Sequence, residues 1–352
     1  MSLQYSKKSD NHYVIDPNCT DDHSDSTVDG SIQWALDQLP VTGGTIELVS
    51  GNYNVSDTDT ILFGTPYTEI VGIGPSSIIT IDQTSGTRPY DTIYNEGHEH
   101  CAVRNLSVSG GVTVQPWTNY GEPIIHADTS AHYFTVENIS TYNVTGLMVD
   151  IGGSDYGKIL NCMFDSLGIC MLVLYNADEA QVIGNTFVHY GNQIGGIDDQ
   201  DHCIYSPYTD STIILDNILI CRNIDGSVTY PIRKALGADG NIIVGNTFWT
   251  RQGGQQSNDG IITISQSNDN LIAMNQCYKG SNGVSLVDGS LRNLIADNLI
   301  RVAWADGIEI EGWSNDNAVP YNSIREYATN RVDDNASGTL GKTEIVGPAW
   351  PA

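Results

Sequence analysis

The segment QVIGNTF at residues 181–187 returns as IIVGNTF at residues 242–248, and looser copies of the pattern fill most of the chain. Each copy places apolar residues on both sides of an asparagine. The nine asparagines that align in this way are Asn105, Asn138, Asn161, Asn185, Asn217, Asn246, Asn275, Asn298 and Asn322. They are separated by 33, 23, 24, 32, 29, 29, 23 and 24 residues, which sets the minimum repeat at about 23 residues.

A second apolar segment lies between successive asparagines, as in GICMLVLYN at residues 168–176 and GIITISQSND at residues 260–269. Each repeat therefore carries one longer strand, a polar turn and two short strands hinged at the asparagine. Three short strands per repeat predict one coil of a right-handed parallel β-helix, with coils stacked about 4.8 Å apart. A propeller blade would need about 40 residues, and a leucine-rich repeat would have a helical or extended return arm. We expect the asparagines to form an internal ladder, since a side-chain amide both donates and accepts hydrogen bonds.

The ends of the solenoid have their own signals. Val28, Ile32, Ala35, Leu36 and Leu39 follow helical spacing before Pro40, which predicts an N-terminal capping helix at about residues 27–39. We assign residues 1–24 to an N-terminal extension, residues 25–328 to a single β-helix domain and residues 329–352 to a C-terminal cap or tail.

The stretches GGTIELVSGNYNV at residues 43–55 and YTEIVGIGPSSIITI at residues 67–81 follow that helix. This combination resembles the start of many proteins of the pectin-lyase-like β-helix superfamily, and the resemblance covers residues 25 to 325. It implies a surface that binds a polysaccharide, with or without turnover.

Composition narrows the choice of partners. The 352 residues include 15 Lys and Arg against 42 Asp and Glu, for a formal charge of −27, so a nucleic-acid partner is not expected. No cofactor is required by any motif, although the acidic charge is compatible with Ca²⁺ binding. Most of the 7 cysteines fall in apolar strand patterns and are expected to be free and buried. The sequence has no transmembrane segment and no signal peptide at its start, and the resemblance favours a secreted, periplasmic or cell-surface protein.

The repeat is interrupted in three consecutive coils, between Asn185 and Asn275. The extra residues fall after the second short strand, in VHYGNQIGGIDDQDH (188–202), CRNIDGSVTY (221–230) and TRQGGQQSNDG (250–260). Stacked loops on one edge would form a wall beside the long-strand sheet. That arrangement resembles the substrate groove of β-helix polysaccharide lyases, epimerases and hydrolases.

Period-two alternation identifies the side chains that face this groove. With Ile204, Ser206 and Ile232 inward, Tyr205 and Arg233 point outward in neighbouring coils. The predicted catalytic residues are His202, Tyr205, Arg233, Asp199 and Asp201. The predicted substrate-binding residues are Asp198, His189, Tyr190, Lys234, Arg251 and Trp249. No metal-ligating residues are predicted.

These residue types suit chemistry on a uronic-acid polymer. Arg233 would pair with the substrate carboxylate, while His202 or Tyr205 removes or returns the C5 proton. Elimination would make the protein a lyase, and reprotonation on the other face an epimerase. The set is similar to that of alginate C5-epimerases, whose DHGIY stretches match DHCIY at residues 201–205 except at Cys203.

Two other functions stay open. A glycoside hydrolase would use paired carboxylates such as Asp198, Asp199 and Asp201. A non-catalytic surface protein or tailspike-like protein would only bind polysaccharide. Glu309 and Glu311 also project to one face, two coils past the long loops, where they would be solvated or form a weak cation site.

Overall fold

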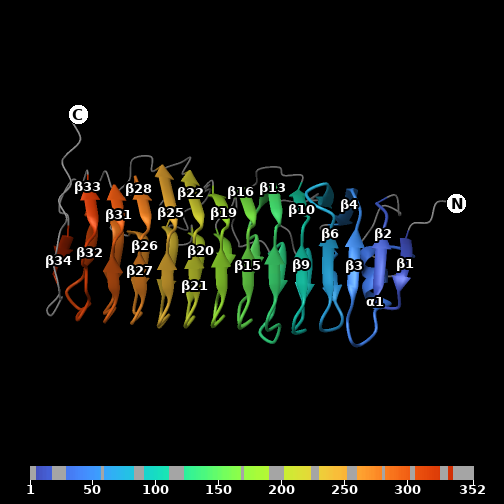
Figure 1. The fold of residues 1–352 in the computed structure, drawn as a ribbon, viewed down its shortest axis with the longest axis horizontal. Helices are drawn as coiled ribbons and strands as arrows, with labels where there is room; N and C mark the ends of the chain where they lie inside the picture. Colours follow the sequence, from blue (N-terminus) through green and yellow to red (C-terminus); the bar gives the residue numbers. More distant parts are fainter. Residues whose placement is uncertain are drawn as a thin grey trace.

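The computed structural model describes residues 5–17, 29–56, 59–82, 91–110, 123–167, 170–189, 202–222, 230–251, 260–279, 282–301, 306–325 and 332–335. The regular structure of these residues consists almost entirely of short strands, which stack into three long sheets along one axis (Figure 1). The chain is a parallel β-helix, as the repeat predicts. We name the three sheets A, B and C.

Sheet A contains the first short strand of each coil. Its strand order rises along the chain without reversal, and every pairing after the β1–β2 hairpin is parallel. The strands are β1 (Tyr5–Ser9), β2 (His12–Ile15), β3 (Thr45–Leu48), β6 (Glu69–Gly72), β9 (Ala102–Arg104), β12 (Thr135–Glu137), β15 (Lys158–Leu160), β18 (Gln181–Ile183), β21 (Ile213–Leu215), β24 (Ile242–Val244), β27 (Leu271–Ala273) and β30 (Leu294–Ala296).

Sheet B contains the strand that follows the asparagine bend. Its strands are β4 (Gly51–Ser56), β7 (Ser77–Asp82), β10 (Ser107–Gly110), β13 (Ser140–Thr145), β16 (Met163–Leu167), β19 (Thr186–His189), β22 (Ile218–Arg222), β25 (Thr247–Arg251), β28 (Gln276–Tyr278), β31 (Leu299–Arg301) and β33 (Ser323–Arg325).

Sheet C contains the strands of the predicted groove, which reach 6 residues only in β20, β23, β26 and β29. Its strands are β5 (Ile61–Phe63), β8 (Ile93–Asn95), β11 (Ile125–Ala127), β14 (Val149–Asp150), β17 (Cys170–Val173), β20 (His202–Pro207), β23 (Tyr230–Ala235), β26 (Gly260–Ser265), β29 (Asn282–Val287), β32 (Ile308–Ile310) and β34 (Val332–Asp334). The variable segments of the repeat join sheet B to sheet C.

The core is one continuous column of apolar side chains inside the coils. Strands with period-two alternation place Ile, Val, Leu and Phe inward, and equivalent positions stack in successive coils, as at Phe164, Phe187, Leu219 and Phe248. No single coil encloses a core by itself, so each depends on its neighbours. Six cysteines, at positions 101, 162, 170, 203, 221 and 277, are free and buried in this part of the chain.

The N-terminal end differs from the later coils. Helix α1 (Ile32–Asp37) is shorter than the predicted range; Ser31 caps it by accepting from the Trp34 amide, and Ile32, Ala35 and Leu36 are buried. Its role as an end cap stays a prediction. Residues 5–15, assigned from the sequence to an extension, form the β1–β2 hairpin and continue sheet A through the β2–β3 pairing. No helix among the described residues is long and apolar enough to cross a membrane.

The asparagine ladder is shorter than the sequence alignment predicts. Six asparagines are buried and bond amide to amide along the axis: Asn185, Asn217, Asn246, Asn275, Asn298 and Asn322. The alignment of Asn161 with Asn185 is wrong by one residue, because Leu160 pairs with Ile183 and thus places Asn161 beside Gly184. Asn105, Asn138 and Asn161 occupy this preceding position, with φ values of +54°, +53° and +53°. Asparagine and glycine both tolerate left-handed backbone, so sequence spacing could not separate the two columns.

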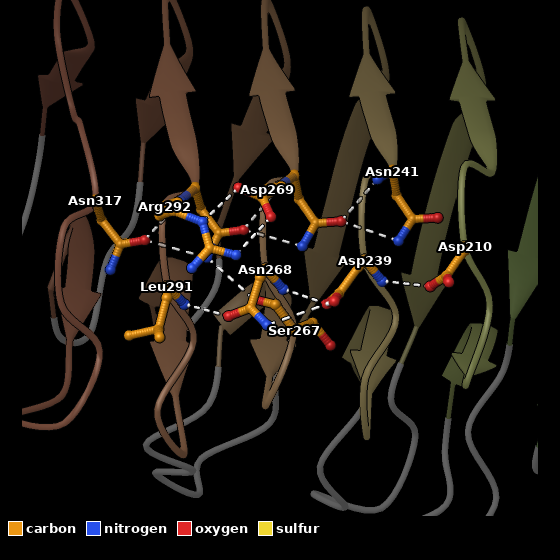
Figure 2. Close-up of polar contacts among 11 residues, drawn as sticks. Asp210, Asp239, Asn241, Ser267, Asn268, Asp269, Leu291, Arg292 and Asn317 are labelled. Carbon is orange, nitrogen blue, oxygen red and sulfur yellow. Dashed lines mark hydrogen bonds and ion pairs between the residues drawn. The ribbon is translucent and has the colours of Figure 1, made fainter.

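Two further ladders order the turn from sheet C to sheet A (Figure 2). Buried Asn241, Asn270, Asn293 and Asn317 form a second amide ladder. Outside it, the carboxylates of Asp178, Asp210 and Asp239 each accept the backbone N–H of the next coil, at 2.8, 2.9 and 2.6 Å. The ladders satisfy turn amides and hold successive coils in register.

Candidate functional site

A row of outward side chains follows the middle of sheet C. Direct pairings join each residue to the next, so neighbours in the row lie about 4.8 Å apart along the axis. We call this the sheet C row; its members are Tyr94, His126, Asp150, Val173, Tyr205, Arg233, Thr263, Ser285 and Glu309. Thr263 and Ser285 are buried, and the other members are partly exposed.

The structure brings together three of the predicted catalytic residues on this row. Tyr205 of β20 pairs directly with Arg233 of β23, and both are partly exposed. The His202 ring stacks on the Tyr205 ring, with centroids 5.1 Å apart and planes at 22°. His202 itself is only 3% exposed, so Tyr205 and Arg233 are the members of this group that solvent reaches.

The electrostatics of Tyr205 reflect two opposing effects. Burial raises the pKa of its phenol, and the positive charge of Arg233 lowers it by a smaller amount, so the pKa stays above its ordinary value. Ile204, Ser206 and Ile232 have no exposed surface, which confirms the inward and outward assignment made from the sequence.

Lys234 does not lie where the sequence analysis placed it. It is completely buried, and its ammonium donates to Ser206 Oγ at 2.7 Å, Thr209 Oγ1 at 3.3 Å and Asn241 Oδ1 at 3.2 Å. The prediction that it binds substrate is therefore wrong. Lys234 has the same strand parity as Ile232, so its side chain must enter the core. Burial lowers the pKa of its amine to about 7.

The remaining predicted residues divide between sheet B and parts of the chain outside the description. His189 ends β19 and Arg251 ends β25. Trp249, also in β25, is 46% exposed, and its ring stacks on the Tyr278 ring with centroids 4.4 Å apart. The Arg301 guanidinium lies over the Tyr278 ring, 6.0 Å from its centroid. Trp249 thus belongs to a different sheet from Tyr205. Tyr190, Asp198, Asp199 and Asp201 lie outside the described residues.

A second polar cluster on the sheet C row was missed by the sequence analysis. His126 Nδ1 lies 2.9 Å from Asp91 Oδ2, and the Tyr94 hydroxyl donates to Asp128 Oδ2 at 3.1 Å. The two rings are 5.0 Å apart. Period-two alternation in DTIYN (91–95) and IIHAD (124–128) carries the signal, and the 33-residue spacing between Asn105 and Asn138, the longest of the eight, marks the coil of His126. The prediction followed the three consecutive long coils instead.

Burial, hydrogen bonds and charges within this cluster shift the pKa values of His126, Asp128 and Tyr94. Burial lowers the pKa of His126, but the bond to Asp91 and the charges of Asp91, Asp150 and Asp128 together raise it above its ordinary value. The Thr129 backbone amide lowers the pKa of Asp128. Burial, followed by the bond to Asp128, raises the pKa of Tyr94 to about 12. The raised pKa favours the protonated imidazole of His126 beside the Asp91 carboxylate.

Cation binding has no built site within the described ranges. No group of three or more His, Cys, Asp or Glu side chains there is arranged to hold a metal ion. Glu309 Oε2 accepts from Asn282 and Ser285 at 2.7 and 3.1 Å, and Glu311 Oε2 accepts from the Asp288 amide at 3.0 Å. Both glutamates bond within the protein.

Comparison with solved structures agrees with this architecture. DFA-IIIase from Arthrobacter chlorophenolicus A6 shares it with a TM-score of 0.62 over 93% of this chain and 99% of that chain, at 12% identity. The mannuronan C-5 epimerase AlgE6 A-module of Azotobacter vinelandii gives 0.57 over 95% and 98%, at 13% identity. These matches show that this chain has a parallel β-helix fold. The Dettilon tailspike protein shares this fold too, with a TM-score of 0.58 over 91% of this chain and 68% of that chain, at 14% identity. No family model and no curated protein matches the sequence.

Proposed function

We propose that this protein acts on a uronate-containing polysaccharide, as a lyase or C5-epimerase, at the part of the sheet C row formed by Tyr205 and Arg233. The direct pairing of these two residues across adjacent coils carries the proposal. This pairing places two groups in adjacent coils. The Tyr205 hydroxyl can transfer a proton, and the Arg233 guanidinium can bind a carboxylate. A sheet face with a row of partly exposed side chains also suits an extended polymer.

Arg233 supplies the electrostatic part of the reaction. Its guanidinium pairs with the substrate carboxylate and neutralises the charge that develops when the C5 proton leaves. The same charge favours the ionised phenol of Tyr205, which opposes the effect of burial on the Tyr205 pKa. One arginine thus both binds the substrate and activates the proposed base.

Tyr205 transfers the proton. Its phenolate takes the C5 hydrogen, and the electron pair moves into the carboxylate to give an enolate. The enolate then expels the glycosidic oxygen at C4, which takes the proton from the Tyr205 phenol, and a C4–C5 double bond remains; this is the lyase reaction. Return of a proton to the opposite face of C5 inverts the sugar instead. His202, buried against the Tyr205 ring, is a positioning residue in this scheme.

The comparison with the Azotobacter vinelandii module supports the choice of substrate class. That protein is by name a mannuronan C-5 epimerase, and its fold matches nearly the whole of this chain. A hydrolase is the second candidate, because a GH87 α-1,3-glucanase shares the fold with a TM-score of 0.55 and 13% identity. The hydrolase would need carboxylates such as Asp198, Asp199 and Asp201.

An assay with three readouts separates these reactions. The protein is incubated with alginate, pectate, glycosaminoglycans and neutral glycans, with Ca²⁺ and with a chelator. Ultraviolet absorbance detects unsaturated ends, reducing-sugar release detects any cleavage, and proton NMR of the polymer detects epimerisation. Arg233→Ala is compared with Arg292→Ala, an exposed arginine paired with Asp269 in the turn.

We expect unsaturated ends or epimerised residues from a uronate polymer with the wild type and Arg292→Ala, and a loss of at least about a hundredfold with Arg233→Ala. Reducing ends without unsaturation would replace the proposal by hydrolysis. No change in any readout, or equal activity in Arg233→Ala, would refute it.

A further inference from the structure

Four rings form a continuous stack on the edge between sheet C and sheet A. Tyr67 and His100 have centroids 4.9 Å apart, His100 and Tyr133 4.4 Å, and Tyr133 and Tyr156 4.7 Å. Their planes lie within 9° of parallel. All four residues have left-handed backbone, with φ between +56° and +60°. We call this set the aromatic ladder.

Register explains why the rings meet. Each ring lies two residues before a sheet A strand, at the same point of its own coil. By the same register, Gly43 occupies the equivalent position in the coil before Tyr67, because Thr45 pairs with Glu69. Glu179 occupies the equivalent position in the coil after Tyr156, because Lys158 pairs with Gln181.

The two ends of the aromatic ladder are therefore different. The Glu179 side chain lies beside Tyr156, where its charge and hydrogen bond raise the pKa of that phenol. Gly43 has no side chain to place over Tyr67, and backbone atoms of residues 66 and 67 fill the space that a Cβ would need. One ring face of Tyr67 stacks on His100, while the opposite face looks toward Gly43. Tyr67 is 60% exposed, the most exposed of the three tyrosines.

A cavity of about 340 Å³ lies at this end of the aromatic ladder. Its lining includes Gly43, Tyr67 and His100 on the ladder side, and Thr45, Glu69 and Arg104 from the outer face of sheet A. Glu69 Oε1 accepts from Thr45 Oγ1 at 3.1 Å, and Arg104 pairs with Glu137 at 3.4 Å. The cavity thus joins one aromatic face to the carboxylate of Glu69, with Arg104 paired to Glu137 beside it.

We propose that this cavity binds one pyranose ring of a neutral glycan, stacked on the Gly43-facing side of Tyr67. An aromatic face attracts the polarised C–H groups of a sugar, and ligand sites combine such a face with a few polar groups. A carboxylate offers about four lone-pair sites, so Glu69 accepts from sugar hydroxyls in addition to Thr45. Because the carboxylates of Glu69 and Glu137 outnumber the single guanidinium of Arg104, an added carboxylate on the sugar is disfavoured here.

The site is separate from the one proposed for catalysis. Tyr67 lies at the turn before β6 of sheet A, whereas Tyr205 and Arg233 belong to β20 and β23 of sheet C. A protein with both sites would hold a neutral glycan at one place while acting on a uronate polymer at another.

Calorimetric titration tests the site directly. Malto-, cello- and manno-oligosaccharides are the neutral probes, and alginate oligosaccharides are the acidic ones. Tyr67→Gly removes the ring at the open end, and Tyr156→Gly removes the ring at the covered end. Both positions have left-handed backbone that glycine adopts without strain, so both variants keep the fold.

We expect at least one neutral probe to bind, with affinity about tenfold weaker in Tyr67→Gly and unchanged in Tyr156→Gly. Tyr67→Phe keeps the ring and should bind within about threefold of the wild type. Arg233→Ala should bind the neutral probe normally even if it has lost activity on uronates, which separates the two proposals. Failure of all neutral probes to bind, or equal weakening in both glycine variants, would overturn the inference.

Discussion

Tyr205 and Arg233 are direct partners across adjacent coils, and the charge of Arg233 opposes the rise in the Tyr205 pKa that burial causes. This relationship links substrate binding to proton transfer in a single pair of side chains. It depends on the register of β20 and β23, since a shift of either strand by one residue would turn its own outward side chain into the core.

Tyr205→Phe tests the proton-transfer role. Removal of the hydroxyl should lower turnover of a uronate polymer by about 10² to 10⁴, the range for general acid–base groups. Tyr208→Phe is the matched control, because Tyr208 follows β20 and is 45% exposed in the turn. Turnover is measured as product formation at saturating substrate. A Tyr205→Phe enzyme as active as Tyr208→Phe would remove Tyr205 from the mechanism.

Replacing Lys234 should alter the pH dependence of stability. Its pKa is about 7 when folded against 10.5 for the free side chain, so between these values the unfolded chain binds the extra proton. The free energy of unfolding therefore rises with pH across this window, by up to about 1.4 kcal/mol per pH unit. Lys234→Met, which has no proton to lose, should lack this rise.

Urea denaturation at neutral and alkaline pH measures that effect as the difference between the two proteins. Lys279→Met, at an exposed position in the turn after β28, is the control and should follow the wild type. Parallel curves for the wild type and Lys234→Met would mean that Lys234 is charged throughout or that its burial has no energetic consequence.

The bond from Asp91 should account for most of the raised pKa of His126. Asp91→Asn should lower that pKa, and Asp150→Asn should lower it less, because the Asp91 bond has the largest raising effect. The stabilisation from the His126–Asp91 pair is fully present below the unfolded pKa of 6.5 and disappears as pH rises through the folded value. NMR titration of the imidazole measures the His126 pKa in each variant. A larger decrease in Asp150→Asn than in Asp91→Asn would contradict the leading role of Asp91.

The buried ladder should matter much more to stability than the exposed asparagines beside it. Asn246 is fully buried, donates to Ile214 O and Asn275 Oδ1, and accepts from the Asn217 amide and side chain. Asn246→Ala would leave these groups unpaired and should cost about 2–4 kcal/mol of unfolding free energy. Asn138→Gly suits the left-handed backbone there and should change it by no more than about 0.5 kcal/mol. Chemical denaturation distinguishes the two, and equal losses would show that the ladder has no special role.

The candidate site could be predicted only in part. Period-two alternation gave the outward positions of Tyr205 and Arg233, and Ile204 and Ile232 confirm it by their burial. The same alternation should have placed Lys234 inside. There its ammonium donates hydrogen bonds to Ser206, Thr209 and Asn241, so it does not contact substrate on the outer face. The three consecutive long coils between Asn185 and Asn275 directed the prediction to residues 188–260, although His126 lies in the longer, 33-residue spacing between Asn105 and Asn138.

The sequence by itself determined the coil, because the strand pattern and the asparagine bends are local properties repeated along the chain. Only the tertiary structure decided which coil positions meet. Tyr67, His100, Tyr133 and Tyr156 are separated by 33, 33 and 23 residues, yet they stack because hydrogen-bond register, rather than chain separation, aligns neighbouring coils. The same register places Asn161 beside Gly184 instead of Asn185, since a coil absorbs extra residues in its loops and leaves the paired strands in step.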